Sequence, residues 1–460
     1  SRELRCEHAF GRSRETSLVS GTVSTPGFPI SAWSPRLRMG LAVAITATAA
    51  GLVGAGCSHL LHIIEHLVFG HFDGTLLQAI SSVPWWHRVL ALSGAGVLGA
   101  LSWYLYSRMG GKPVSLPQAV DGQKMPFWLT LWHSLNQILI VGMGASIGRE
   151  VAPREISASL GGKISDLLGL TPPQRRIIVG CAAGAGLAAV YSLPLSGAVF
   201  ALEILLLEVN ASTVWPALVI SGGAVLVAHG WVRTDPFYSL PEAAQITPTA
   251  SLTLWAIIVG PLLGILGTLF KSAVKSYSAA RPTGWKLLVW MIPTFTLIGV
   301  ITIWVPSIAG NGQSTAQLAF DGAILGEGAR AASGIGLALL VSLLIDGLTK
   351  LVGTLATIRS GAWGGTLTPG LALGGSCGAV FGVIWSHIYP GDTTAIVCFA
   401  FIGAVVFLGT SMSAPLTALC LVIEFTHRGA TLLVPTTIAL GLGVGASRLW
   451  TQLRTRQTKA

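Results

Sequence analysis

The sequence predicts a membrane protein that is built of helices and duplicated within one chain. Hydrophobic residues make up 52% of the 460 residues and charged residues only 10%, and the mean hydropathy is +0.70. These values lie outside the range of soluble proteins, so most of the chain is expected to lie in lipid. A motif in the middle of the chain recurs near its end, which indicates two related halves.

Five long apolar windows predict helices that cross the membrane. Each window holds roughly 18 or more largely uncharged residues, which is enough to cross about 30 Å of hydrocarbon. The windows start near Leu41, Val89, Val214, Leu252 and Leu287.

Other apolar runs are short or are interrupted by glycine and proline. Backbone that is not helical survives at membrane depth only where protein or a water-filled cavity receives its hydrogen bonds. Broken helices at corresponding places of two repeats therefore indicate a solute site. The interrupted runs are 141–153, 177–194, 361–375, 399–415 and 433–445.

The repeat is marked by two motifs that occur in the same order in each half. The sequence S-L-P-L at 192–195 leads to Glu203, and S-A-P-L at 413–416 leads to Glu424, 221 residues later. A second motif, G-R-E-V-A-P, starts at Gly148 and has its counterpart G-G-T-L-T-P 216 residues later. Chance similarity between apolar segments is the alternative, but two ordered markers at nearly one offset disfavour it.

Charge and polarity divide the chain into five segments. Both ends are rich in arginine, so the positive-inside bias predicts that both termini are cytoplasmic. The net charge of +10 is typical of residues that face anionic lipid, and we do not expect nucleic-acid binding. The expected segments are a basic N-terminal segment (1–38), a first membrane repeat (39–230), a connecting loop (231–250), a second membrane repeat (251–447) and a basic tail (448–460).

A histidine-rich segment raises the alternative of a zinc enzyme. His62, Glu65 and His66 form the H-x-x-E-H pattern of inverted zincins, which would imply a membrane metallopeptidase. No third ligand cluster follows, and histidines are comfortable at a membrane boundary, so we expect no enzyme, no metal and no cofactor. The six cysteines contain no C-x-x-C pair and mostly fall in apolar segments, as buried side chains do.

The two glycine-rich breaks predict an anion site. A helix N-terminus exposes unpaired N–H groups and about half a positive charge, so two such ends would bind a small anion between them. Glu150 lies in the first break, where a carboxylate is expected to mark an ion or proton path. The Glu150 carboxylate can occupy the same site that an anion would use, and protonation would release it from that site. A structural ion pair with Arg149 is the alternative interpretation.

These residues resemble the CLC family of chloride channels and chloride/proton antiporters. Gly148-Arg149-Glu150 is similar to the start of the family's G-R-E-G-P signature, and the motif at 365–369 is similar to its G-x-F-x-P signature. The S-x-P-L helices fit two later helices of the family. The match spans about residues 39–447 and favours short prokaryotic members without a regulatory domain.

The resemblance implies an all-α, inverted-topology repeat of many tilted and broken helices. It further implies a homodimer with one pore in each subunit, in a bacterial inner membrane, that carries chloride and other small anions. Glu150 would be the gating and proton-carrying glutamate, and the backbone N–H groups of Thr366 and Leu367 would hold the central anion. The anion path implied by the resemblance is formed by Val114, Ser115, Gly148, Arg149, Val151, Thr366 and Leu367.

Several positions depart from the family pattern. Aligning Pro117 with a signature proline puts Val114 where the family has an anion-binding serine, with Ser115 one place away. A tyrosine expected near the C-terminus is missing, since the last tyrosine is Tyr389. Each lost hydrogen bond to a charged partner is worth on the order of 1.5–3 kcal/mol, so we expect weak chloride binding and loosened selectivity.

A further departure concerns protons. Family antiporters carry an internal proton-accepting glutamate one residue after the glutamate of the first S-x-P-L helix, and this chain has Ile204 after Glu203. Protons could reach Glu150 through water, or from Glu203, Glu208 or Glu155. We expect chloride/proton antiport, with a passive chloride channel and a structural protein with a decayed site as the alternatives.

Overall fold

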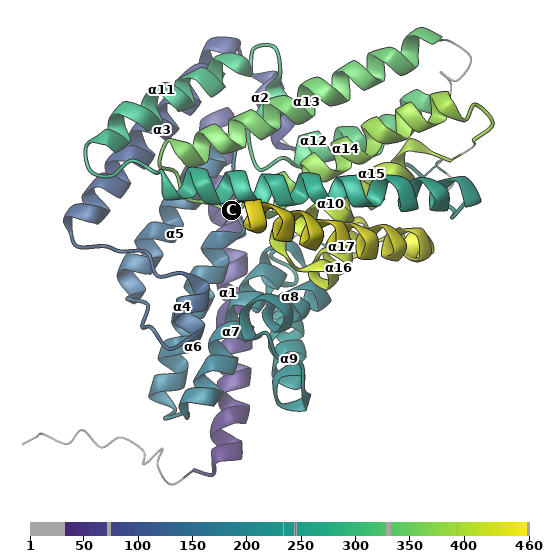
Figure 1. Cartoon of the computed structure of the whole chain (residues 1–460). Coiled ribbons are helices and arrows are strands. Elements are labelled where there is room, and N and C mark those ends of the chain that lie inside the picture. Colours follow the sequence, from purple (N-terminus) through teal and green to yellow (C-terminus); the bar gives the residue numbers. More distant parts are fainter. Residues whose placement is uncertain are drawn as a thin grey trace, which may run out of the picture.

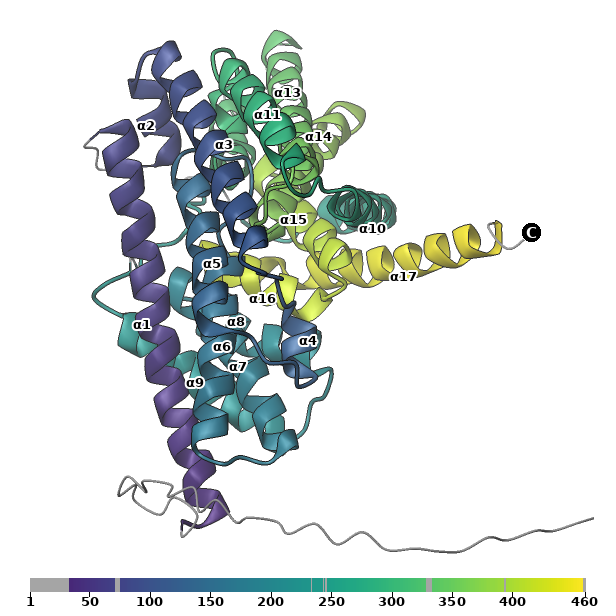
Figure 2. The same cartoon turned by 90° about the vertical axis from the view of Figure 1, so that its left-hand side faces the viewer.

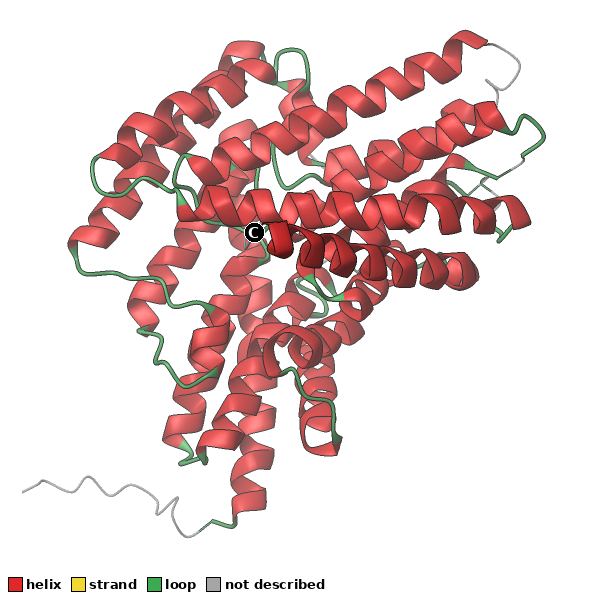
Figure 3. Ribbon diagram, in the orientation of Figure 1, coloured by secondary structure: helices red, strands yellow, loops and turns green. Residues whose placement is uncertain are grey.

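The computed structural model describes residues 33–70, 75–232, 234–242, 244, 246–327, 333–392 and 394–457. Within these ranges the chain forms seventeen α-helices and no β-sheet (Figure 3). The fold class predicted from the sequence is therefore confirmed. The basic N-terminal segment lies almost entirely outside the described residues.

The first half of the chain folds into nine α-helices, and the eighth of them continues directly as a π-helix. The elements are α1 (Pro35–Phe69), α2 (Leu76–Ser82), α3 (Trp85–Arg108), α4 (Leu116–Val120), α5 (Phe127–Gly142), α6 (Val151–Leu167), α7 (Pro172–Tyr191), α8 (Pro194–Phe200), the π-helix (Ala201–Leu206) and α9 (Ala211–Ala228).

The second half contains the remaining helices and two short 3-10 turns. They are α10 (Ala250–Ala279), α11 (Lys286–Ile301), a 3-10 turn (Pro306–Ile308), α12 (Gln313–Glu327), α13 (Ser333–Arg359), α14 (Leu367–Ile388), α15 (Ile396–Met412), α16 (Pro415–Thr426), a second 3-10 turn (Ala430–Leu432) and α17 (Leu433–Gln457).

The two halves repeat one packing scheme. In the first half α1 packs on α6, α7 and α9, and α7 packs on α6, α8 and α9. In the second half α10 packs on α14, α15 and α17 in the same way, and α15 packs on α14, α16 and α17. Corresponding helices also meet across the molecule, since α3 packs along α11 and α8 packs against α16 (Figures 1 and 2).

Seven helices in the described part of the chain are long and apolar enough to cross a membrane. Four of them contain the predicted windows that start near Leu41, Val89, Val214 and Leu252. The prediction that the window near Leu287 crosses the whole membrane was wrong, because the helix there, α11, is only 16 residues long. The prediction of a broken helix at 433–445 was also wrong, because α17 continues through the glycines of this run to Gln457. The three spans that the windows missed are in α13, α14 and α17.

The S-x-P-L motifs end one helix and start the next by the same geometry. Ser192 and Ser413 both adopt the left-handed backbone conformation, with φ of 57° and 55°. This conformation stops α7 and α15, and a proline two residues later is the first residue of the next helix. Proline suits that position because its missing N–H would be unpaired there anyway.

Two glutamates bind the helix starts of the opposite halves: Glu203, in the π-helix that continues α8, and Glu424, near the end of α16. The Glu203 carboxylate accepts hydrogen bonds from the N–H groups of Leu416 and Thr417 at 3.0 and 2.6 Å, at the start of α16. The Glu424 carboxylate accepts bonds from Leu195 N and Ser196 N at 3.0 and 2.7 Å, at the start of α8. Each carboxylate thus satisfies the first orphan N–H groups of the opposite half.

We predict that Glu203→Gln and Glu424→Gln destabilise the protein by similar amounts, roughly 1–2 kcal/mol each, because each removes one charged helix cap. Thermal unfolding of the purified protein in detergent measures both effects. The exposed Glu242 provides the control as Glu242→Gln. A large loss for one cap and none for the other would contradict the symmetric role.

Candidate functional site

The two glycine-rich breaks meet at the centre of the fold. The N–H of Gly148 donates to the carbonyl of Gly365 at 2.8 Å, and the N–H of Gly365 donates back to Gly148 at 2.8 Å. The two segments run antiparallel at this point. The pair brings together the start of α6 and the start of α14, as the sequence predicted for the two breaks.

Glu150 is the residue that directly precedes α6, yet its side chain does not cap α6. Its carboxylate accepts hydrogen bonds from the N–H of Leu367 at 2.8 Å and from the Thr368 hydroxyl at 3.4 Å. The side chain is fully buried. The carboxylate therefore lies at the N-terminus of α14, where the helix dipole and free N–H groups favour a negative charge.

The carboxylate fits there only because two neighbours are glycines. A Cβ added at Gly148 or at Gly365 would overlap the carboxylate of Glu150. No ion pair joins Glu150 to Arg149 in the part of the chain that the structure describes. The structural ion pair considered above is therefore not the arrangement that this carboxylate adopts.

Three cations surround the break, and sequence reasoning missed two of them. The Arg149 guanidinium lies 5.0 Å from the Tyr191 ring centroid. Arg154 is buried and donates from Nε to the carbonyl of Glu150 at 2.7 Å. Lys350, on α13, is fully buried and binds the hydroxyl of Ser146 at 3.0 Å. A lysine inside an apolar helix was a signal in the sequence that could have found it.

Lys350 also joins the first break to the second half. Its Nζ donates to the carbonyls of Ile308 and Gly310 at 3.1 and 2.5 Å, and the N–H of Gly310 binds Gly144 O at 2.9 Å. No carboxylate neutralises these three cations by an ion pair within the described ranges. The first break is therefore lined by three basic side chains as well as by the Glu150 carboxylate, and basic groups attract anions.

The segment aligned with the family's serine motif has no free hydroxyl to donate to an anion. Val114 is buried in the same cluster as Leu367. Ser115 is exposed, and its hydroxyl caps its own helix α4 by accepting from Gln118 N at 3.4 Å and donating to Gln118 Oε1 at 2.9 Å. Thr366 and Val151 are partly buried at the starts of α14 and α6.

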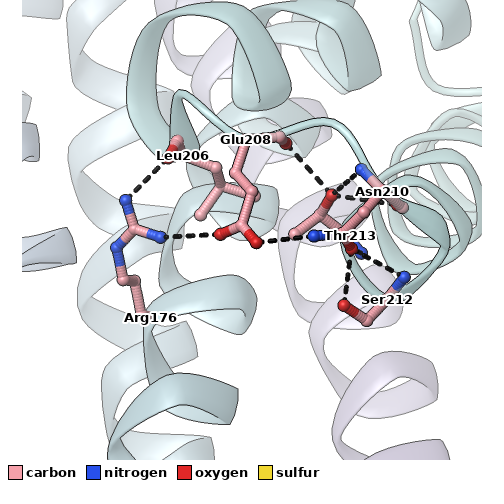
Figure 4. Close-up of polar contacts among 6 residues, drawn as sticks. All are labelled: Arg176, Leu206, Glu208, Asn210, Ser212 and Thr213. Carbon is pink, nitrogen blue, oxygen red and sulfur yellow. Dashed lines mark hydrogen bonds and ion pairs between the residues drawn. The ribbon is translucent and has the colours of Figure 1, made fainter.

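Two of the acidic groups considered for a proton path are engaged elsewhere. Glu203 caps α16, as described above. Glu208 is exposed and forms an ion pair of 3.5 Å with Arg176 (Figure 4). It also accepts a bond from the Asn210 amide at 2.5 Å at the start of α9 (Figure 4). Ile204 is partly buried in the π-helix that follows α8.

A buried polar cluster surrounds Glu155, on α6. Glu155 accepts hydrogen bonds from Ser134 Oγ at 3.1 Å and Gln137 Nε2 at 3.0 Å, and its carboxylate lies 3.9 Å from His133 Nε2. The indole N–H of Trp103 donates to His133 Nδ1 at 3.0 Å. The imidazole is therefore neutral, with its proton on Nε2 facing Glu155.

The histidine-rich segment pairs internally, near the end of α1. His62 Nδ1 lies 3.1 Å from the Glu65 carboxylate, and His59 packs edge-on against Trp231 at 5.8 Å between ring centroids. Over the described ranges, no three His, Cys, Asp or Glu side chains gather closely enough to hold a metal. The geometry gives the metallopeptidase alternative no support.

A family model and several known proteins match most of this chain. Residues 95–448 match the family model for the voltage gated chloride channel. A putative chloride channel protein ClcB-like from Ralstonia nicotianae is 27% identical over 369 residues, which cover 77% of this chain and 81% of the relative. The voltage-gated ClC-type chloride channel ClcB of Escherichia coli (strain SMS-3-5 / SECEC) is 27% identical over 405 residues, covering 83% and 90%.

Solved structures show the same architecture. A slow cyanobacterial Cl-/H+ antiporter superposes with a TM-score of 0.74 at 19% identity, covering 91% of this chain and 98% of that one. A CLC-type fluoride/proton antiporter superposes with a TM-score of 0.60 at 20% identity, covering 90% and 95%. The fold and site thus define a multi-pass membrane transport protein. The chain belongs to the voltage gated chloride channel family, which confirms the resemblance inferred from its motifs.

We predict that Gly365→Ala costs stability chiefly by expelling the Glu150 carboxylate. In the Glu150→Ala background the added methyl has room, so the cost should fall, and a double-mutant cycle should give a coupling of about 1–3 kcal/mol. Thermal unfolding in detergent measures each corner of the cycle. Gly375→Ala, on α14, is the control, because the nearest atom to a Cβ added there is 3.7 Å away. Additive effects would mean that the carboxylate does not lie beside Gly365.

Proposed function

We propose that this protein exchanges chloride for protons across a bacterial inner membrane, with Glu150 as the gate and proton carrier. One observation carries the proposal: the Glu150 carboxylate is bound to the N–H of Leu367 at 2.8 Å, at the N-terminus of α14. A chloride ion would use the same N–H groups. Carboxylate and anion therefore compete, and protonation of Glu150 releases the site to chloride.

Proton coupling is favoured by the solved relatives, two of which are described as Cl-/H+ and fluoride/proton antiporters. The passive chloride channel stays the second candidate, because Ile204 cannot carry a proton and Glu203 is bound to α16. In the antiport mechanism Glu155 supplies the proton instead. It lies on α6 roughly 7.5 Å along the helix from Glu150, and His133 presents an N–H toward it.

The assembly and orientation follow the same proposal. The protein acts as a homodimer with one anion path in each subunit and with both termini in the cytoplasm. Arg448, Arg454 and Arg456 at the end of the chain fit a cytoplasmic surface that carries anionic lipid. The anion path uses Gly148, Arg149, Val151, Thr366 and Leu367, with Val114 and Ser115 at the position of the missing serine donor.

The direct test is flux in liposomes, with chloride and pH electrodes reading together while a chloride gradient is released. Antiport predicts that chloride efflux drives protons inward against their gradient. Chloride efflux without proton movement would establish the channel, and no efflux of chloride or fluoride would remove anion transport altogether.

We predict that Glu150→Gln conducts chloride without moving protons and without pH dependence, because the amide mimics the protonated acid but cannot titrate. The two-electrode assay measures both fluxes, and Glu242→Gln is the matched control on the surface. Unchanged proton coupling in Glu150→Gln would exclude Glu150 from the mechanism.

We predict that Glu155→Gln keeps chloride flux and lowers proton flux per chloride at least tenfold, since the amide retains its bonds to Ser134 and Gln137 but cannot relay a proton. Glu208→Gln should transport as the native protein does, because Glu208 is exposed and paired with Arg176. The opposite pattern in the two variants would place the proton route along the π-helix side.

A further inference from the structure

Trp103, near the end of α3, packs against His133 on α5, and both side chains are buried. The indole N–H donates to Nδ1 of His133 at 3.0 Å, and the two ring centroids lie 6.0 Å apart. An indole nitrogen can only donate, so Nδ1 must present its lone pair to Trp103. The single proton of the imidazole is then on Nε2, which lies 3.9 Å from the Glu155 carboxylate.

This contact leaves no place for a second proton on His133. A positively charged imidazole carries an N–H on both ring nitrogens. The N–H on Nδ1 would point at the indole N–H of Trp103, and the hydrogen bond between the two side chains would be lost. A buried indole N–H without an acceptor costs free energy. Trp103 therefore holds the imidazole in its neutral form.

Glu155 is the acidic group that faces the imidazole. It lies on α6, and it is the one carboxylate within ion-pair distance of His133 in the described part of the chain. The titratable neighbour on α3 is Tyr106, whose ring centroid lies 5.5 Å from that of the imidazole. Helix α1 also packs on α5, where apolar side chains of α1 meet Gly142. A charge on His133 would therefore act first on Glu155.

A cation lies one ring away from the imidazole. Trp363, in the second glycine-rich break, packs edge-on against His133 at 5.1 Å between ring centroids. Arg281, which follows α10, lies over the Trp363 ring at 4.1 Å from its centroid. Like charges repel, so the guanidinium disfavours a positive charge on the imidazole in addition to the contact with Trp103.

The Glu155 carboxylate is bound by neutral groups, the hydroxyl and the amide described above. Arg154, its neighbour in the chain, is engaged elsewhere: its Nε donates to the carbonyl of Glu150 at 2.7 Å, and its guanidinium lies 5.1 Å from the Phe200 ring centroid. No lysine or arginine forms an ion pair with Glu155 within the described ranges. A protonated His133 would be the first cation to pair with this carboxylate.

We propose that Trp103 is a positioning residue for proton transport: by holding His133 neutral, it keeps Glu155 free to bind and release a proton. The proposal rests on the proton route through Glu155 proposed above. A protonated His133 would form an ion pair with Glu155 and hold the carboxylate in its ionised form. A carboxylate held in this way cannot accept a proton, so proton transport would stop while the anion path stayed open.

The number of protons moved per chloride, measured in liposomes at two pH values, tests this role. Trp103→Phe keeps an aromatic ring but lacks the N–H, so His133 can take up a second proton as the pH falls from about 8 to about 5. Relative to the native protein at the same pH, we expect unchanged coupling at about pH 8 and a roughly tenfold lower proton flux per chloride at about pH 5. Chloride flux is retained at both. Trp132→Phe is the control, because the Trp132 N–H donates to Ser102 at 2.9 Å and not to a histidine.

A second substitution separates this role from a structural one. His133→Gln keeps an N–H donor but cannot become charged, so it should couple as the native protein does. Trp103→Phe/His133→Gln should regain native coupling at about pH 5. Native coupling of Trp103→Phe at both pH values, or a loss that the double variant does not restore, overturns the proposal. Loss of coupling in His133→Gln alone also overturns it, because His133 would then carry protons itself.

Nitrogen NMR of the native protein with isotope-labelled histidine gives a measurement that needs no tryptophan variant. The signals of His133, identified by their absence from His133→Gln, should show a neutral ring protonated at Nε2 from about pH 8 to about pH 5. A ring that gains a second proton in this range overturns the proposal. The spectra also separate it from the proposed proton route. If Glu155→Gln moves protons as the native protein does, the route through Glu155 is wrong, and the spectra still decide whether Trp103 holds His133 neutral.

Discussion

The reciprocal hydrogen bonds between Gly148 and Gly365 organise the rest of the structure. They require two segments that are not helical, deep among apolar helices, to satisfy each other's backbone groups. In doing so they hold the start of α6 beside the start of α14. Glu150 can then reach across the molecule to Leu367, and neither break could form this site with its own half alone.

The site balances charge in a way that suits a transported anion. Arg149, Arg154 and Lys350 lie around the first break, but the groups that touch the Glu150 carboxylate are a backbone N–H and a hydroxyl. Neutral donors hold an anion less tightly than a direct ion pair, which favours release. Lys350 binds two carbonyls and a hydroxyl, so it links the first break to the second half.

The sequence predicted the architecture because its two markers record the repeat directly, and it predicted Glu150 because a carboxylate in a glycine-rich break is costly without a role. It could not predict that α11 ends at Ile301, since the hydropathy stays high through the following turn. The contact of Lys350 with Ser146 was also hidden. It joins segments that are far apart in the sequence, and the periodicity of one segment carries no information on such contacts.

The exchanged caps of α8 and α16 bear on how the molecule arose. Glu203 completes a helix of the second half, and Glu424 completes the equivalent helix of the first. A single half would have a glutamate with no helix start to cap, and a helix start with no glutamate to accept its N–H groups. Two identical copies that face each other in opposite orientations would satisfy both groups. An ancestral gene for one half could therefore have produced a working pair before duplication and fusion joined the copies into one chain.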